Sequence, residues 1–171
     1  MDLSKRIYVL DASALFYFPS LLDAELWTTE LVVNEVKNDV EKDIVKKMID
    51  NKDLLVGSAP LESIKEVITV ANELSEIHKL SKADLSLLAL SLYLKEKGEN
   101  VMLLTDDYAM QNIALHLKIN VSSISGKSIT HKIVWEFYCP ACRKTISSFK
   151  VKECPICGTP LKRKPKTKEP L

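Results

Sequence analysis

The sequence predicts an α/β fold built on a parallel sheet, followed by a small metal-bound module. Short apolar stretches alternate with helical segments through residues 1–124, which is the pattern of a parallel sheet flanked by helices. All four cysteines fall between Cys139 and Cys157 in two Cys-x-x-Cys pairs. The charge also changes sign along the chain: residues 1–131 hold 14 Lys and Arg against 20 Asp and Glu, whereas residues 132–171 hold 10 against 3.

The length of 171 residues leaves room for one domain of ordinary size and a small appendage. We expect an α/β domain at 1–124, a polar linker at 125–131, a zinc ribbon at 132–162 and a disordered basic tail at 163–171. No apolar run approaches the ~18–20 residues needed to cross a bilayer. The N-terminus has no signal-peptide pattern. We therefore expect a cytoplasmic protein.

Four short apolar stretches are expected to form the strands of the sheet: 7–10, 54–56, 101–104 and a stretch near Val121. The first stretch ends at Asp11, and the third ends in Thr105-Asp106-Asp107. Ligands of parallel sheets bind beyond the carboxyl ends of the strands. These acidic residues therefore stand where a functional site is expected.

Helical segments are expected between the strands, at 12–16 with a stop at Pro19, after a cap at Thr28 or Thr29, and at 39–49, 60–78, 81–98 and 109–117. Glu35 lies on the second of these segments. Ser81 and Asp84 have the spacing of a capping box, which places Asp84 in a first helical turn.

The cysteines predict a structural zinc site. The pairs Cys139/Cys142 and Cys154/Cys157 are separated by eleven residues, and two such turns can meet in a tetrahedral Cys₄ site. A module of about 40 residues cannot bury a sufficient core, so zinc binding, on the order of 10–16 kcal/mol in model peptides, must support it. A thiol-redox role is disfavoured because it needs only one pair. We predict one zinc ion per chain.

Five carboxylates form a candidate catalytic set: Asp11, Glu35, Asp84, Asp106 and Asp107. Carboxylates that gather without cationic partners repel one another, and a hard divalent cation relieves that repulsion. Mg²⁺ or Mn²⁺ at such a cluster activates water and offsets charge on a phosphate, which suits phosphodiester hydrolysis. Each residue also has a simpler explanation, because Asp84 is favoured at a helix N-terminus and the Asp pair suits a turn.

Four strings, in this order, resemble the PIN-domain nucleases: VLDASALF, TTELVVNEV, LSKADLSLLAL and TDDYAMQNIA. With the Cys₄ ribbon, nearly the whole chain resembles the NIN-one-binding family of ribosome-maturation endonucleases. The resemblance implies a PIN-like, Rossmann-like sheet, Mg²⁺ or Mn²⁺ at the acidic cluster, and an endoribonuclease that cleaves precursor small-subunit (16S/18S-type) ribosomal RNA to form its 3′ end. It also implies a KH-domain assembly factor as a partner.

The resemblance assigns the metal-binding roles to Asp11, Glu35, Asp84 and one or both of the adjacent aspartates. The Thr-x-Asp spacing favours Asp107, whereas Asp106 is nearer the strand end, so both remain candidates. The resemblance implies that Ser13 and Thr105 support the site by hydrogen bonding to a carboxylate or to bound water.

Basic residues of the second half predict a phosphate-binding surface: Arg143, Lys144, Lys150, Lys152, Lys162, Arg163 and Lys164. Trp135, Tyr138 and Phe149 either stack on unpaired RNA bases or pack the ribbon. Two alternative functions stay open. One is a toxin-type or general PIN ribonuclease, which we expect to match only the first domain. The other is a non-catalytic zinc-ribbon RNA-binding assembly factor.

Overall fold

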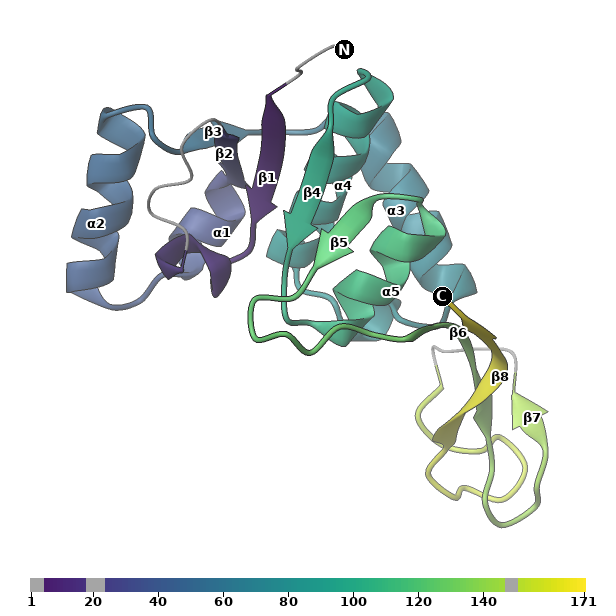
Figure 1. Cartoon of the computed structure of the whole chain (residues 1–171). Helices are drawn as coiled ribbons and strands as arrows, with labels where there is room; N and C mark the ends of the chain where they lie inside the picture. Colours follow the sequence, from purple (N-terminus) through teal and green to yellow (C-terminus); the bar gives the residue numbers. More distant parts are fainter. Residues whose placement is uncertain (1–4, 18–23, 147–150) are drawn as a thin grey trace.

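The structure is a computed structural model that describes residues 5–17, 24–146 and 151–171 (Figure 1). Its larger part is a five-stranded sheet in the order β3-β2-β1-β4-β5, with all neighbouring strands parallel. Its strands are β1 (Arg6–Leu10), β2 (Ala24–Thr29), β3 (Leu55–Gly57), β4 (Val101–Leu104) and β5 (Asn120–Ser122). The predicted parallel α/β fold is confirmed, with five strands in place of four.

Strand β2 is the strand that the sequence analysis did not predict. Its sequence AELWTT has no continuous apolar run. Thr28 is nevertheless fully buried, and its hydroxyl donates to the carbonyl oxygen of Leu10 at 2.9 Å. A hydroxyl that bonds in this way costs little to bury. The predicted cap is present at the last residue of the strand, because Oγ1 of Thr29 accepts from the backbone N–H of Val32 at 3.4 Å.

Within the described ranges, five α-helices and two 3₁₀ turns connect the strands: η1 (Ala14–Phe16), α1 (Glu30–Glu35), α2 (Asp39–Asp50), α3 (Leu61–Glu73), η2 (Ile77–Lys79), α4 (Lys82–Glu96) and α5 (Tyr108–His116). The helix predicted at 60–78 ends early, because Ser75 adopts a left-handed φ of 57° that an α-helix cannot contain. The predicted stop at Pro19 lies outside the described residues.

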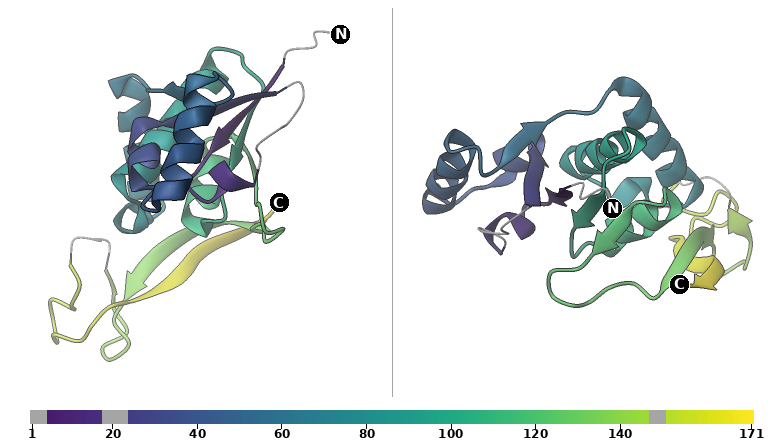
Figure 2. Two further views of the ribbon diagram at one scale, coloured as in Figure 1. Left: turned by 90° about the vertical axis from the view of Figure 1, so that its left-hand side faces the viewer. Right: turned by 45° about the horizontal axis from the view of Figure 1, so that its top comes forward.

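The core of this domain is organised around α4. This helix packs on β1, β2 and β4 and also contacts α1, α3 and α5 (Figures 1 and 2). Leu87, Leu88 and Leu90 on successive faces of α4 are almost fully buried, as expected for a helix covered on most sides. The predicted capping box at Ser81 and Asp84 starts this helix. No helix in the described ranges is long and apolar enough to cross a membrane.

The second part of the chain is a three-stranded antiparallel sheet with the order β7-β6-β8. It consists of β6 (His131–Tyr138), β7 (Thr145–Ile146) and β8 (Lys162–Pro170). The prediction that the tail 163–171 is disordered is therefore wrong. Strand β8 lies at the sheet edge, where its cations can face solvent and where Pro165, which lacks an N–H, is tolerated beside the irregularity between Val134 and Trp135.

The β6–β8 hairpin is docked against the first domain. The side-chain amide of Asn112 on α5 donates to the carbonyl of Ile133 at 2.7 Å and accepts from its N–H at 2.9 Å. The N–H of Trp135 donates to the carbonyl of Leu74 at 3.3 Å. The hairpin projects from the side of the sheet to which the arrows of β1 and β4 point (Figures 1 and 2). The ribbon therefore lies on the side where the functional site is expected.

Candidate active site and metal centre

The adjacent strands β1 and β4 bring three of the predicted aspartates to one edge of the sheet. The backbone N–H of Asp11, the first residue after β1, donates to the carbonyl of Leu104, the last residue of β4, at 3.2 Å. The segment with Asp106 and Asp107 follows Leu104 directly. Asp11 therefore lies beside this segment at the carboxyl ends of both strands.

Helix α4 brings Asp84 to the same edge. The hydroxyl of Thr29, which ends β2, lies 2.8 Å from the hydroxyl of Ser86 in the first part of α4. Asp84 precedes Ser86 by two residues, and β2 is the neighbour of β1. Glu35 is exposed at the end of α1, a helix that starts from the same strand end and packs against α4. The sequence analysis missed the Thr29–Ser86 bond.

Three aspartates have one carboxylate oxygen fixed by local hydrogen bonds. Oδ1 of Asp11 accepts from the hydroxyl of Ser13 at 2.6 Å and from the N–H of Ala14 at 2.9 Å. Oδ2 of Asp84 accepts from the N–H of Ser81 at 2.7 Å, and Oδ1 of Asp107 caps α5. The second oxygen of each carboxylate accepts no hydrogen bond from the described residues. Fixed carboxylates with a free oxygen suit a hard divalent cation.

Asp106 has a different environment from Asp107. Its Oδ1 accepts from the N–H groups of Ser125 at 3.1 Å and Ile124 at 2.9 Å, which attaches the loop after β5 to the end of β4. The hydrogen bond from the backbone of Ser125 is the main cause that lowers the pKa of Asp106, so this carboxylate is held in its charged form. Both aspartates remain candidates for metal binding.

The two predicted supporting residues differ in their access to the site. The hydroxyl of Ser13 contacts the carboxylate of Asp11 directly. Thr105 is fully buried, and its Oγ1 accepts from the N–H of Asp107 at 3.1 Å. Thr105 therefore positions the backbone of Asp107 and does not face the open side of the site.

The four cysteines form a compact metal-binding group. Their sulfur atoms all lie within 4.8 Å of one another, with 3.4 Å between Cys139 and Cys157 and 3.6 Å between Cys142 and Cys154. A tetrahedron of thiolates around zinc has sulfur–sulfur edges of about 3.8 Å, from Zn–S bonds of about 2.3 Å. In the described part of the chain, no other group of three or more acidic, His or Cys side chains is as compact. The carboxylates share an edge but do not close into such a set.

Each Cys pair sits in a similar turn. The N–H of Arg143 donates to the carbonyl of Cys139, and the N–H of Gly158 donates to the carbonyl of Cys154, each at 2.9 Å. Arg143 and Gly158 have left-handed φ angles of 61° and 70°. The first turn therefore accepts the strain of a non-glycine residue in a conformation that favours glycine.

Local hydrogen bonds favour thiolates at two of the cysteines. The side chain and backbone N–H of Thr159 lower the pKa of the Cys157 thiol to about 6. The backbone N–H of Cys142, 3.4 Å from Sγ of Cys139, is the main cause that lowers the pKa of Cys139. Metal coordination requires the thiolate form, so each turn has one cysteine that ionises readily. The hydrogen bond from the backbone of Lys144 lowers the pKa of Cys142, but burial and the neighbouring cysteine side chains outweigh it and raise that pKa to about 11.

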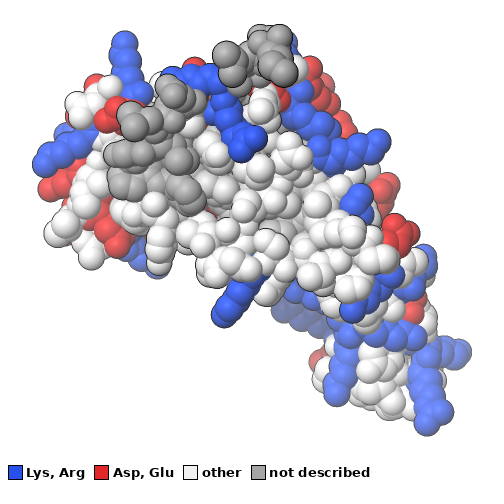
Figure 3. All heavy atoms as spheres, in the orientation of Figure 1, with Lys and Arg blue, Asp and Glu red and all other residues white. Residues whose placement is uncertain are grey.

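Most of the predicted RNA-binding cations are exposed on the ribbon: Arg143, Lys144, Lys152, Lys162 and Lys164. Lys and Arg side chains are concentrated on the ribbon in Figure 3. Arg163 is the exception, because its side chain is only 19% exposed and its Nη1 lies 2.7 Å from Oε2 of the buried Glu76. It also stacks on Trp135 at 4.0 Å, so both residues belong to the domain interface. The predicted roles of Phe149 and Lys150 lie outside the described residues.

Comparison with known proteins agrees with this architecture. Residues 8–94 match the family described as "PIN domain of ribonuclease", so the first part of the chain is a PIN domain. Two relatives named endoribonuclease Nob1 are similar along almost the whole chain. The protein from Methanocaldococcus jannaschii is 36% identical over 93% of this chain and 78% of its own. The protein from Archaeoglobus fulgidus is 33% identical over 90% and 88%.

These matches include the cysteine-containing part, and the chain belongs to the Nob1 endoribonuclease family of PIN-domain proteins. A protein named ribonuclease VapC1 from Thermoplasma acidophilum is also 30% identical over 92% of this chain and 77% of its own. The match to this relative therefore also extends beyond the first domain. The presence of the ribbon alone therefore does not distinguish the relatives named Nob1 from the relative named VapC1.

Proposed function

We propose that this endoribonuclease cleaves precursor small-subunit ribosomal RNA, of the 16S/18S type, to form its mature 3′ end. The observation that carries the proposal is the gathering of aspartates with free oxygens at one edge of the sheet, in a chain that matches Nob1 endoribonucleases along most of its length. The ribbon supports it further by presenting a basic surface on the same side as that edge.

The carboxylate edge is the proposed catalytic centre. Asp11 and Asp84 hold Mg²⁺ or Mn²⁺, and Glu35 with Asp106 or Asp107 completes the ligand set. A divalent cation bound there supplies Lewis-acid chemistry, which activates water and offsets the charge on the scissile phosphate. Ser13 and the turn at Ala14 keep the Asp11 carboxylate oriented. We expect products with a 5′-phosphate and a 3′-hydroxyl.

The cysteine site is proposed to hold one structural zinc ion per chain. The sulfur spacings fit thiolate ligation of zinc, and the ribbon is too small to be stable without such support. RNA phosphates are proposed to bind the exposed cations of the ribbon. A cytoplasmic location and a KH-domain assembly factor as partner are further proposals, and the support for the partner is the family resemblance.

A cleavage assay tests the proposed function. The substrate is an RNA that spans the 3′ end of small-subunit ribosomal RNA, incubated with and without Mn²⁺. We expect Mn²⁺-dependent cleavage at one position, its loss in Asp11→Asn, and its retention in the matched control Asp43→Asn, which changes an exposed aspartate on α2.

The same assay separates the alternative functions. Cleavage of unrelated RNAs at the same rate would favour a general or toxin-type ribonuclease. Binding of the RNA without any cleavage would favour a non-catalytic RNA-binding assembly factor. Full activity of Asp11→Asn would contradict the assignment of the catalytic edge.

A further inference from the structure

A groove of about 450 Å³ lies between the β6–β8 hairpin and the first domain. It is bounded by η2, the first turns of α5, the segment before β6, and the strands β6 and β8. Tyr108 lines it and is 53% exposed. Because Tyr108 follows Asp107 directly, the groove starts beside the carboxylate edge and leads from there to the ribbon.

The charge of the groove suits a polyanion. Its lining contains Lys79, Arg163 and Lys168 against the single carboxylate of Glu76, a balance of +2. The Glu76 side chain is only 3% exposed and is paired with both Arg163 and Lys79. Lys168 forms no ion pair with the described residues. The charge that the groove presents to solvent is therefore positive.

We propose that this groove binds the single-stranded RNA segment next to the scissile phosphate. Tyr108 stacks on a base, and Lys168 and Lys79 contact phosphates of the same strand. Stacking on an exposed aromatic ring together with a cationic channel is a common way to hold single-stranded nucleic acid. The proposal rests on the proposed function and adds to it the route of the substrate.

The repulsion between the acidic edge and RNA explains why a cationic groove beside it would help the substrate to bind. Its carboxylates repel an RNA backbone wherever the cation does not neutralise them, so the edge alone is a poor binding surface. Cations in an adjoining groove offset that repulsion without occupying the catalytic edge. A strand held in the groove also has little freedom when it reaches Asp107, which favours a fixed position of the scissile phosphate.

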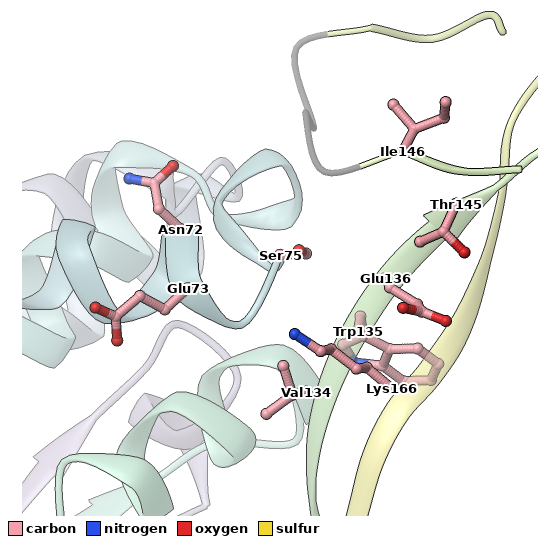
Figure 4. A pocket seen from close by; sticks show the side chains of 9 residues that line it. All are labelled: Asn72, Glu73, Ser75, Val134, Trp135, Glu136, Thr145, Ile146 and Lys166. Carbon is pink, nitrogen blue, oxygen red and sulfur yellow. The ribbon is translucent and has the colours of Figure 1, made fainter.

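A second cavity on the other side of the hairpin suits RNA less well. It has a volume of about 370 Å³ and lies between the end of α3 and the ribbon, with Trp135 in its lining (Figure 4). Its charged lining residues are Glu73 and Glu136 against Lys166. The balance of −1 becomes neutral when the pairing of Glu136 with Lys164 at 3.1 Å is counted, so this cavity lacks the net positive charge of the groove. Neither Tyr108 nor Asp107 lines it.

RNA binding by the full-length, zinc-loaded protein tests the proposal. The probe is a fluorescein-labelled 12-nucleotide single-stranded RNA, measured by anisotropy without Mg²⁺ or Mn²⁺ at several salt concentrations. We expect Tyr108→Ala to raise Kd about tenfold, within the range known for base stacking, while Tyr108→Phe stays near wild type. We expect Lys168→Ala to raise Kd and to reduce the slope of log K against log salt by about 0.7, the value for one lost phosphate contact.

Matched controls make the result specific. Tyr93→Ala changes an aromatic residue of α4 that does not line the groove, and Lys46→Ala removes an exposed cation of α2; both should bind like wild type. If the wild-type protein binds and cleaves RNA but Tyr108→Ala and Lys168→Ala match its Kd and salt slope, the groove is not the route and the proposed function stands. If the wild-type protein neither binds nor cleaves RNA, both proposals fail.

Discussion

Replacing Arg163 by methionine should lower the free energy of unfolding by about 3 kcal/mol. The change removes the guanidinium that lies 2.7 Å from the carboxylate of Glu76 and 4.0 Å from the ring of Trp135. Methionine keeps a long apolar side chain over the Trp135 ring, so the packing there is largely preserved. The main effect is the loss of a charge partner for Glu76.

The magnitude follows from the burial of Glu76. Its side chain is 3% exposed, and removing one partner of a buried ion pair typically costs about 3–5 kcal/mol. The cost falls at the lower end here for two reasons. Arg163 is itself 19% exposed, and the ammonium of Lys79 stays 3.7 Å from the Glu76 carboxylate.

Thermal and denaturant unfolding of zinc-loaded protein measure this effect. A loss of about 3 kcal/mol corresponds to a fall in Tm of roughly 6–12 °C for a chain of this size. Adding Glu76→Gln to Arg163→Met should recover part of the loss, because no unpaired buried charge remains. Lys162→Met, at the exposed neighbouring position of β8, is the control and should change stability by less than about 0.5 kcal/mol. A loss below about 1 kcal/mol in Arg163→Met would show that this pair does not hold the ribbon in place.

Three further predictions concern the acidic edge, the zinc site and the half-buried His116. Asp107→Asn should leave the free energy of unfolding within about 0.5 kcal/mol of wild type, because Asn caps helices as well as Asp, but should reduce Mn²⁺-dependent cleavage if Asp107 holds the cation. Elemental analysis should find one zinc per chain, and its removal by a chelator should unfold the ribbon and weaken RNA binding. Burial is the main cause that lowers the pKa of His116, so its contribution to stability should be present above about pH 6.5 and be lost as the pH falls from there through the lowered folded-state pKa.

Each of these predictions has its own measurement and contrary result. Cleavage by Asp107→Asn at the wild-type rate, combined with loss of cleavage in Asp106→Asn, would assign the ligand to Asp106. Purified protein without zinc would remove the structural role of the cysteine site. For the histidine, Tm is measured from pH 7 to pH 5 in wild type and His116→Gln. An equal fall in both proteins would show that His116 does not cause the pH dependence.

The sequence predicted the features that local chemistry determines. The capping box at Ser81 and Asp84, the cap at Thr29 and the two cysteine pairs each depend on residues close together in the chain, and the structure contains all of them. The strand ends at Asp11 and Asp106 were predicted for the same reason. A parallel sheet then brings its strand ends to one edge, so the grouping of these aspartates followed from the fold class.

The features that the sequence analysis missed depend on distant partners. Strand β2 buries Thr28, whose hydroxyl donates to the carbonyl of Leu10. Strand β8 forms because it pairs with β6, although the composition of its segment alone predicted disorder. Arg163 was assigned to RNA because it lies in a run of cations. Its partner Glu76 is 87 residues away in the chain, and composition cannot distinguish a cation that faces solvent from one that meets a buried carboxylate.

Helix α5 couples the two parts of the molecule more directly than the linker does. Asp107 caps its first turn, and one helical turn later the buried Gln111 accepts from the N–H of Ile129 at 2.9 Å. The next residue, Asn112, holds β6 through two hydrogen bonds to Ile133. The string TDDYAMQN therefore places a carboxylate of the proposed catalytic edge at the N-terminus of the helix that carries the anchors of the ribbon. A displacement of this helix would move both, so α5 sets the position of the proposed RNA-binding surface relative to the acidic edge.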